Sequence, residues 1–196
     1  IQNQHDRLIN AYRKSIRFTS FLTFPLLIGG VMVAPALFRL LFKSEWWDAI
    51  PFFQMLCMGG CFTVLTAINN NFIKVSGRSS GILRIEIVKM ALTAVSIALL
   101  ARESVLAMVA GLMAVRGVVH LINIYYTQRY TDYGMWAQLC DTVPYLLLAV
   151  VMAAAVWSVG LVVDKPWLLL PLQIVAGAAV YTLLAYATGS KILKDA

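Results

Sequence analysis

The sequence predicts an all-α integral membrane protein, and its composition and apolar patterning lead to that fold class. Of its 196 residues, 61% are hydrophobic and only 13% are charged, and the mean hydropathy is +0.79. Soluble domains are closer to half apolar and a quarter charged. The apolar residues also gather into runs of about 20, the length that an α-helix needs to cross a hydrocarbon core about 30 Å thick. About six transmembrane helices are therefore expected.

The six apolar runs and the polar segments beside them predict five regions in the chain. The runs are 17–42, 50–75, 80–101, 104–128, 139–163 and 166–188. The regions are a basic cytoplasmic loop segment at 1–16, a four-helix core with a polar lining at 17–128, a cytoplasmic interfacial loop at 129–138, a C-terminal transmembrane helix pair at 139–188 and a cytoplasmic tail at 189–196. The chain opens at Ile1 on a polar segment without a signal sequence, so we expect it to be the later part of a longer polypeptide.

Lysines and arginines near the ends of the spans predict orientation, because they are retained on the cytoplasmic side of a membrane. With the N-terminus inside, eleven of them fall on the cytoplasmic side and four on the other, and Arg116 belongs to neither group. Both ends of the chain are then cytoplasmic. The eleven are Arg7, Arg13, Lys14, Arg17, Lys74, Arg78, Arg84, Lys89, Arg129, Lys191 and Lys194, and the four are Arg39, Lys43, Arg102 and Lys165. The net charge of +7 is thus mainly a topology signal, and such scattered cations do not favour nucleic-acid binding.

The first span is interrupted by residues that let a membrane helix bend or hinge, namely Pro25, Gly29, Gly30 and Pro35. A static kink would leave the same pattern. The short turn at 43–48 that follows holds two tryptophans, which suit the headgroup level of a bilayer.

Polar residues follow one face of each of the next three spans. Ionisable groups inside membrane helices nearly always face the bundle interior or a wet cavity. Spacings of three and four residues place each series on one helical face, so the sequence predicts a common polar lining. The series are Thr63, Thr66, Asn70 and Lys74 in the second span, Glu86, Lys89, Thr93 and Ser96 in the third, and Arg116, His120, Asn123 and Thr127 in the fourth.

Arg116, in the stretch AVRGVVHLIN, is the least expected of these residues in lipid. Its guanidinium keeps its charge, and it lies too near the middle of its span to reach the interface easily. A charge at the centre of a membrane helix costs roughly 2.5–3.5 kcal/mol on insertion scales, so a functional role is predicted. Two other interpretations stay open. Arg116 could form a structural pair with Glu86, or Glu86 could pair with Lys89 near the interface.

We predict that the deepest polar residues of these spans form a substrate-binding lining. His120 could instead be a packing residue, and the threonines and serines could only bond carbonyls of the preceding turn. No catalytic residue, cofactor or metal is expected. Cys57 and Cys61 have no nearby histidine or carboxylate to complete a metal site, and they should pack as small apolar residues. The predicted lining residues are Arg116, His120, Asn123, Glu86, Lys89, Asn70 and Thr66.

Four segments together carry a family resemblance. RLINAYRKSIRF runs into FPLLIGGVMVAPALFRLLF, and SEWWDAIPFFQML and NNNFIKVSGRSSGILRIEIV follow. They resemble the later part of Wzx-type polysaccharide and lipopolysaccharide flippases, which belong to the MOP (multidrug/oligosaccharidyl-lipid/polysaccharide) exporter superfamily. In that family a kinked helix leads to an outer turn like Leu41 and Phe42 through Trp47 and Ala49. An inner Gly-Arg turn, here Gly77 and Arg78, follows one helix later.

The resemblance implies a transporter of about twelve to fourteen helices in two pseudo-symmetric lobes, with this chain forming most of the second lobe. The implied substrate is an undecaprenyl-pyrophosphate-linked oligosaccharide, moved across the bacterial inner membrane by alternating access for surface polysaccharide biosynthesis. The implied partners are this lipid-linked oligosaccharide, membrane lipid, the N-terminal lobe of the same polypeptide and polysaccharide polymerase machinery. Arginine suits a pyrophosphate through its fork of donors.

Three other functions compete with export. A multidrug or cation antiporter of the same superfamily would need an acidic cavity, and Glu86 is the only acid predicted to lie deep. An integral-membrane glycosyl- or acyltransferase would need paired acids, a metal cluster or an activated nucleophile. Asp141, beside Cys140, has no second acid or histidine spaced to act with it, so no enzymatic activity is expected. The third is a purely structural membrane-assembly partner.

Overall fold

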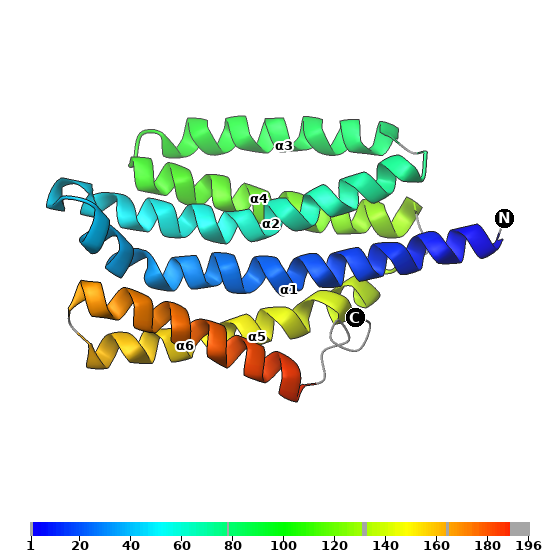
Figure 1. Cartoon of the computed structure of the whole chain (residues 1–196). Helices are drawn as coiled ribbons and strands as arrows, with labels where there is room; N and C mark the ends of the chain where they lie inside the picture. Colours follow the sequence, from blue (N-terminus) through cyan, green and yellow to red (C-terminus); the bar gives the residue numbers. More distant parts are fainter. Residues whose placement is uncertain (1, 78, 131–132, 164, 189–196) are drawn as a thin grey trace. The chain divides into compact units, whose positions relative to one another are not determined.

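The computed structural model describes residues 2–77, 79–130, 133–163 and 165–188, and regular structure in these ranges is helical throughout (Figure 1). The all-α fold is confirmed, and each predicted span corresponds to one α-helix, although α1 begins well before the first predicted span. The elements are α1 (Gln2–Leu41), the 3-10 helix η1 (Ser44–Ala49), α2 (Ile50–Val75), α3 (Ser79–Leu100), α4 (Val105–Tyr130), α5 (Met135–Val162) and α6 (Pro166–Ala187).

Five helical segments of the described chain are long and apolar enough to cross a membrane, which makes this a multi-pass membrane protein. They are Arg7–Leu41, Ser44–Val75, Val105–Arg129, Met135–Val162 and Pro166–Ala187. The 22-residue helix α3 is long enough but carries Arg84, Glu86 and Lys89 in its first half. Charges on a lipid-facing helix are costly, so α3 depends on its neighbours. It lies beside α4 along its length (Figure 1), and its own crossing of the membrane stays a prediction.

The chain forms two compact units, and the division falls within helices rather than between them. Unit 1 consists of Ile1–Thr19 and Gly59–Val143 and holds all of α3 and α4. Unit 2 consists of Ser20–Met58 and Pro144–Ala196 and holds η1 and α6. Helices α1, α2 and α5 each contribute to both units. The predicted boundaries at 17–128 and 139–188 therefore do not follow this division.

Unit 1 has an apolar core to which α2, α3 and α4 each contribute a buried β-branched residue. Close helix packing accompanies it, because a Cβ atom on Gly111 of α4 would overlap the hydroxyl of Ser96 and a methyl group of Leu100 on α3. Small residues let membrane helices approach in this way. The core residues are Ile73, Ile85 and Val119.

In unit 2, the two prolines inside α1 are each accommodated by a side chain from another helix. A proline has no backbone N–H, so the carbonyl four residues earlier loses its helical partner. The carbonyl of Val31, four residues before Pro35, accepts a hydrogen bond from Gln54 Nε2 of α2 at 3.0 Å. The carbonyl of Phe21, four residues before Pro25, accepts a hydrogen bond from the hydroxyl of Tyr181 of α6. These bonds let α1 continue as one helix through both prolines.

The structure differs from the expected cytoplasmic loops. Residues 2–16 belong to α1, because Tyr12 and Ile16 on one face of this segment are buried in unit 1. In the expected loop at 129–138, residues 129–130 belong to α4, which ends at Tyr130, and residues 135–138 belong to α5, which begins at Met135. The predicted inner turn is represented by Gly77, whose φ of +74° suits a residue without a Cβ. Arg78 of that turn, residues 131–132 and the tail at 189–196, with Lys191 and Lys194, lie outside the described residues.

Candidate functional site

A polar pocket in unit 1 lies between α2, α3 and α4. Its volume is about 510 Å³. Five of the seven predicted lining residues reach it, and all three helices contribute. They are Thr66 and Asn70 from α2, Glu86 and Lys89 from α3, and Arg116 from α4. The structure thus brings the three polar helix faces together, and their role in binding a substrate stays a prediction.

Arg116 lies near the middle of α4 and its side chain is exposed at the pocket. It packs across α2 at Gly59, where a Cβ atom would be 3.3 Å from both Cδ and Nη1 of the arginine. Among the described residues, no carboxylate forms an ion pair with Arg116. The structural pair with Glu86 is therefore not formed, because Glu86 pairs with Lys89.

The ion pair between Glu86 and Lys89 spans one turn of α3 at the edge of the pocket. The two side chains are 40% and 43% exposed, so the pair is open to solvent and contributes little to stability. With these charges matched, Arg116 gives the lining a net positive charge. Such a lining favours an anionic ligand over a cationic one.

His120 and Asn123 are buried behind the pocket lining rather than in it. His120 Nδ1 lies 3.1 Å from the hydroxyl of Thr66. The side-chain amide of Asn123 donates a hydrogen bond to Oδ1 of the Asn70 side chain. These two residues therefore hold in place the polar side chains that α2 presents to the pocket.

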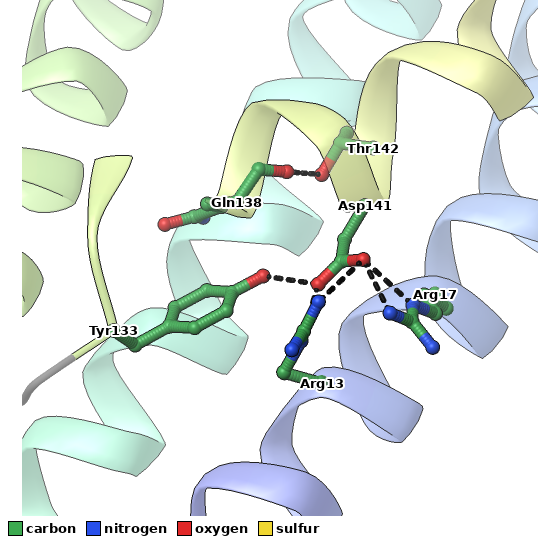
Figure 2. Close-up of polar contacts among 6 residues, drawn as sticks. All are labelled: Arg13, Arg17, Tyr133, Gln138, Asp141 and Thr142. Atoms are coloured by element: carbon green, nitrogen blue, oxygen red, sulfur yellow. Dashed lines mark hydrogen bonds and ion pairs between the residues drawn. The ribbon is translucent and has the colours of Figure 1, made fainter. Parts of the chain in front are cut away.

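A second polar cluster in unit 1 joins the first part of α1 to the start of α5, as Figure 2 shows. Its centre is Asp141, whose side chain is 3% exposed. The carboxylate accepts hydrogen bonds from Nε of Arg13 and Nε of Arg17, each at 2.8 Å. The hydroxyl of Tyr133 donates a third bond at 2.8 Å. One buried acid is thus paired with two cations, as a charge inside a membrane protein requires.

Aromatic and amide side chains extend this cluster toward α2. The hydroxyl of Tyr12 donates a hydrogen bond to Asn69 Oδ1, which also accepts one from Gln138 Nε2 at 3.0 Å. The Tyr12 ring stacks on Phe72, with centroids 4.0 Å apart, and meets Tyr133 edge to face. Burial, and after it the hydrogen bond to Asp141, raise the pKa of Tyr133 well above its usual range. Its hydroxyl therefore remains a donor at neutral pH.

The sequence did not predict this second cluster. In the sequence, Arg13 and Arg17 indicate topology, and nothing near Asp141 indicates its partners, because the paired residues lie 128 and 124 positions apart in the chain. One signal was nevertheless present. A single acid inside an apolar span requires a cation from another helix, and the basic segment before the first span is a natural source.

The pocket presents charged and hydrogen-bonding groups. It offers the guanidinium of Arg116, the paired charges of α3, and the amide and hydroxyl groups of Asn70 and Thr66. These groups suit an anion accompanied by hydroxyl groups. In the described part of the chain, no three His, Cys, Asp or Glu residues lie close enough together to hold a metal ion.

The fold and pocket define an all-helical, multi-pass membrane protein with a polar, cation-bearing pocket among apolar helices. Residues 1–51 match a protein family described as "Polysaccharide biosynthesis protein". The match covers α1 and η1, including Arg13 and Arg17, and ends at the start of α2. No curated protein and no solved structure matches the chain. The family match supports a role in polysaccharide biosynthesis.

Proposed function

We propose that this chain is part of an exporter that moves a lipid-linked oligosaccharide across the bacterial inner membrane for surface polysaccharide biosynthesis. The observation that carries the proposal is the position of Arg116. It lies in the middle of an apolar helix, faces the polar pocket, and has no carboxylate partner among the described residues. A permanent charge placed in this way is expensive in a membrane unless a ligand uses it. The match at residues 1–51 supports a role in polysaccharide biosynthesis, with which such a cargo is consistent.

The substrate we propose is an oligosaccharide on undecaprenyl pyrophosphate. Its pyrophosphate is a dense anion, which a guanidinium such as that of Arg116 binds through two parallel donors. Asn70 and Thr66 supply partners for sugar hydroxyls. The apolar tail of the carrier stays in the bilayer, outside the polar path.

The proposed exporter works by alternating access, with this chain in the second of two lobes and both of its ends cytoplasmic. Its proposed partners are the N-terminal lobe of the same polypeptide, membrane lipid and polysaccharide polymerase machinery, and it performs no chemical step. A cation antiporter is the second candidate in the same superfamily. The lining disfavours it, because two cations accompany the single acid Glu86.

The test replaces Arg116 by alanine and by lysine in the complete exporter. Arg116→Ala should reach the membrane at normal levels and lose most polymer export, and Arg116→Lys should retain part of it, because lysine keeps the charge but not the fork of donors. Arg84→Ala is the matched control, since it removes an exposed arginine of α3 that does not line the pocket. Transfer of labelled lipid-linked sugar in vesicles gives the direct readout. Normal transfer by a well-expressed Arg116→Ala protein would refute the proposal.

A further inference from the structure

A second hollow of unit 1, with a volume of about 350 Å³, lies beside the first part of α1. Its described lining consists of Asn10, Arg13, Lys14 and Arg17. These residues occupy positions i, i+3, i+4 and i+7, so they share one face of the helix. Three of the four are cations, whereas the pocket that contains Arg116 is lined by α2, α3 and α4.

Asp141 holds the two arginines in place, but it does not use all of their N–H donors. Arg13 gives the carboxylate its Nε and, at 3.4 Å, one terminal nitrogen. Arg17 gives it Nε and a terminal nitrogen at 2.6 Å. Each guanidinium has five N–H groups, so each arginine keeps several N–H groups that do not bond to Asp141. The hydroxyl of Tyr133 also donates a hydrogen bond to the Asp141 carboxylate. Asp141 therefore orients the two arginines, and their remaining N–H groups can bind a ligand.

The charges around this hollow do not balance. Among the residues whose side chains the structure describes, Arg13, Lys14 and Arg17 line the hollow and Asp141 is the one carboxylate paired with them, which is an excess of two positive charges. Arg17 is largely buried, with 13% of its side chain exposed, and Arg13 is 36% exposed. Cations in such partly buried positions interact more strongly with an anion than fully hydrated cations do. The hollow therefore fits an anionic group.

The position of the hollow indicates an anion that belongs to a lipid. α1 is apolar enough to span the membrane from Arg7 onward, so these cations lie in the first turns of a span, at the level of lipid headgroups. Phe18 follows Lys14 by four residues on the same helix face and is 58% exposed. An apolar side chain thus adjoins the cations one turn deeper, where the acyl chains of a lipid would lie.

We propose that Arg13, Lys14 and Arg17 bind the phosphate group of an anionic membrane phospholipid. Asp141 and Tyr133 act as positioning residues, because they fix the guanidiniums at the hollow without contacting the lipid. This site does not depend on the transport cycle. It can therefore be tested on the whole purified chain, and its failure would leave the proposed function untouched.

The experiment titrates the whole chain in detergent with short-chain phosphatidylglycerol and measures bound lipid by native mass spectrometry. Lys14→Gln and Arg13→Gln should each weaken binding by about fivefold, the effect of one cation near an anionic lipid surface. Lys14 forms neither a hydrogen bond nor an ion pair with Asp141, so Lys14→Gln leaves the buried ion pairs intact. Arg129→Gln and Arg84→Gln remove the same charge from exposed positions of α4 and α3 outside the hollow, and as controls they should leave the affinity unchanged. Equal losses in the controls, or none in the hollow variants, would overturn the proposal.

Two further comparisons test the lipid source and the positioning role. Glycerol phosphate carries the same phosphate without acyl chains and should bind at least about tenfold more weakly than phosphatidylglycerol. Equal affinity would show that a free phosphate is the ligand.

Asp141→Asn adds one positive charge to the cluster. If Asp141 orients the arginines, affinity falls in a variant whose unfolding temperature is preserved, and a rise in affinity would show that charge alone matters and overturn the positioning role. Should this variant unfold, Tyr133→Phe makes the same test, because it removes one contact of Asp141 without changing the charge.

Discussion

The hydroxyl of Tyr181 in α6 donates a hydrogen bond to the backbone carbonyl of Phe21 in α1, at 2.8 Å. Phe21 lies four residues before Pro25, which lacks the N–H that would otherwise bind this carbonyl. In the hydrocarbon core of a membrane no water can replace the missing partner. A side chain of α6 therefore satisfies the backbone group that the sequence of α1 leaves unpaired, and α1 and α6 are joined at a proline in unit 2.

Tyr181→Phe should destabilise unit 2 by about 1–3 kcal/mol, the cost of leaving a buried carbonyl without a partner. The ring and its packing are kept, so the loss isolates the hydrogen bond. The measurement is the unfolding temperature of the purified chain in detergent. Tyr186→Phe is the matched control, because Tyr186 lies in the same helix and is 79% exposed. An equal change in both variants would contradict this role for Tyr181.

Local pattern was sufficient to predict the helices and their polar faces. The length of each apolar run gave six helices, and spacings of three and four residues placed Thr66 and Asn70 on the same face of α2. The prolines of α1 were likewise recognisable as interruptions. Their hydrogen-bond partners were not, because Tyr181 lies 160 residues from Phe21 and nothing local to either residue specifies the other.

Close packing of α3 against α4 leads to a second prediction, at Gly111. Gly111→Ala should destabilise unit 1 by about 1–3 kcal/mol, because the new methyl group would overlap Ser96 and Leu100. Gly117→Ala in the same helix is the control. Its Cβ would lie 3.8 Å from the Phe62 ring, an ordinary contact, and alanine is the better helix former. Unfolding temperatures of the two variants should therefore shift in opposite directions, and a loss in Gly117→Ala as large as that in Gly111→Ala would argue against the packing explanation.

The start of α1 shows why the second polar cluster escaped prediction. A segment as polar as residues 1–16 resembles a loop when it is considered alone. Its helix is stabilised by tertiary contacts, namely the burial of Tyr12 and Ile16 and the ion pairs of Arg13 with Asp141. The partner lies on α5, and sequence periodicity carries no information about pairings between helices so far apart in the chain.

The titration of Tyr133 gives a third prediction. Burial, and after it the hydrogen bond to Asp141, raise the pKa of this tyrosine above its ordinary value of about 10, so the folded state holds the proton more tightly than the unfolded state. The resulting stabilisation is complete below about pH 10 and is lost as the pH rises further. Tyr133→Phe removes this titration. The difference in unfolding free energy between the parent chain and the variant should be constant near neutral pH and decrease above about pH 10. A difference that stays constant through this alkaline range would show that the folded and unfolded states bind the proton equally.

The last prediction concerns Gly59, where the side chain of Arg116 crosses α2. A Cβ atom at this position would lie 3.3 Å from Cδ and Nη1 of the arginine, so Gly59→Ala should displace the guanidinium by a few tenths of an ångström. Arginine is flexible and alanine favours a helix, so membrane levels of the protein should not fall.

Transport should respond differently, because a displaced guanidinium makes weaker charge-assisted hydrogen bonds to its ligand. A loss of up to about 1.4 kcal/mol in these bonds corresponds to a fall in export of about two- to tenfold. Gly117→Ala again serves as the control, since it adds the same methyl group next to Arg116 in sequence but meets only the Phe62 ring. Export of surface polymer, normalised to the amount of protein in the membrane, is the readout. If Gly59→Ala exports normally while Arg116→Ala does not, the charge of Arg116 is needed but its placement over Gly59 is not.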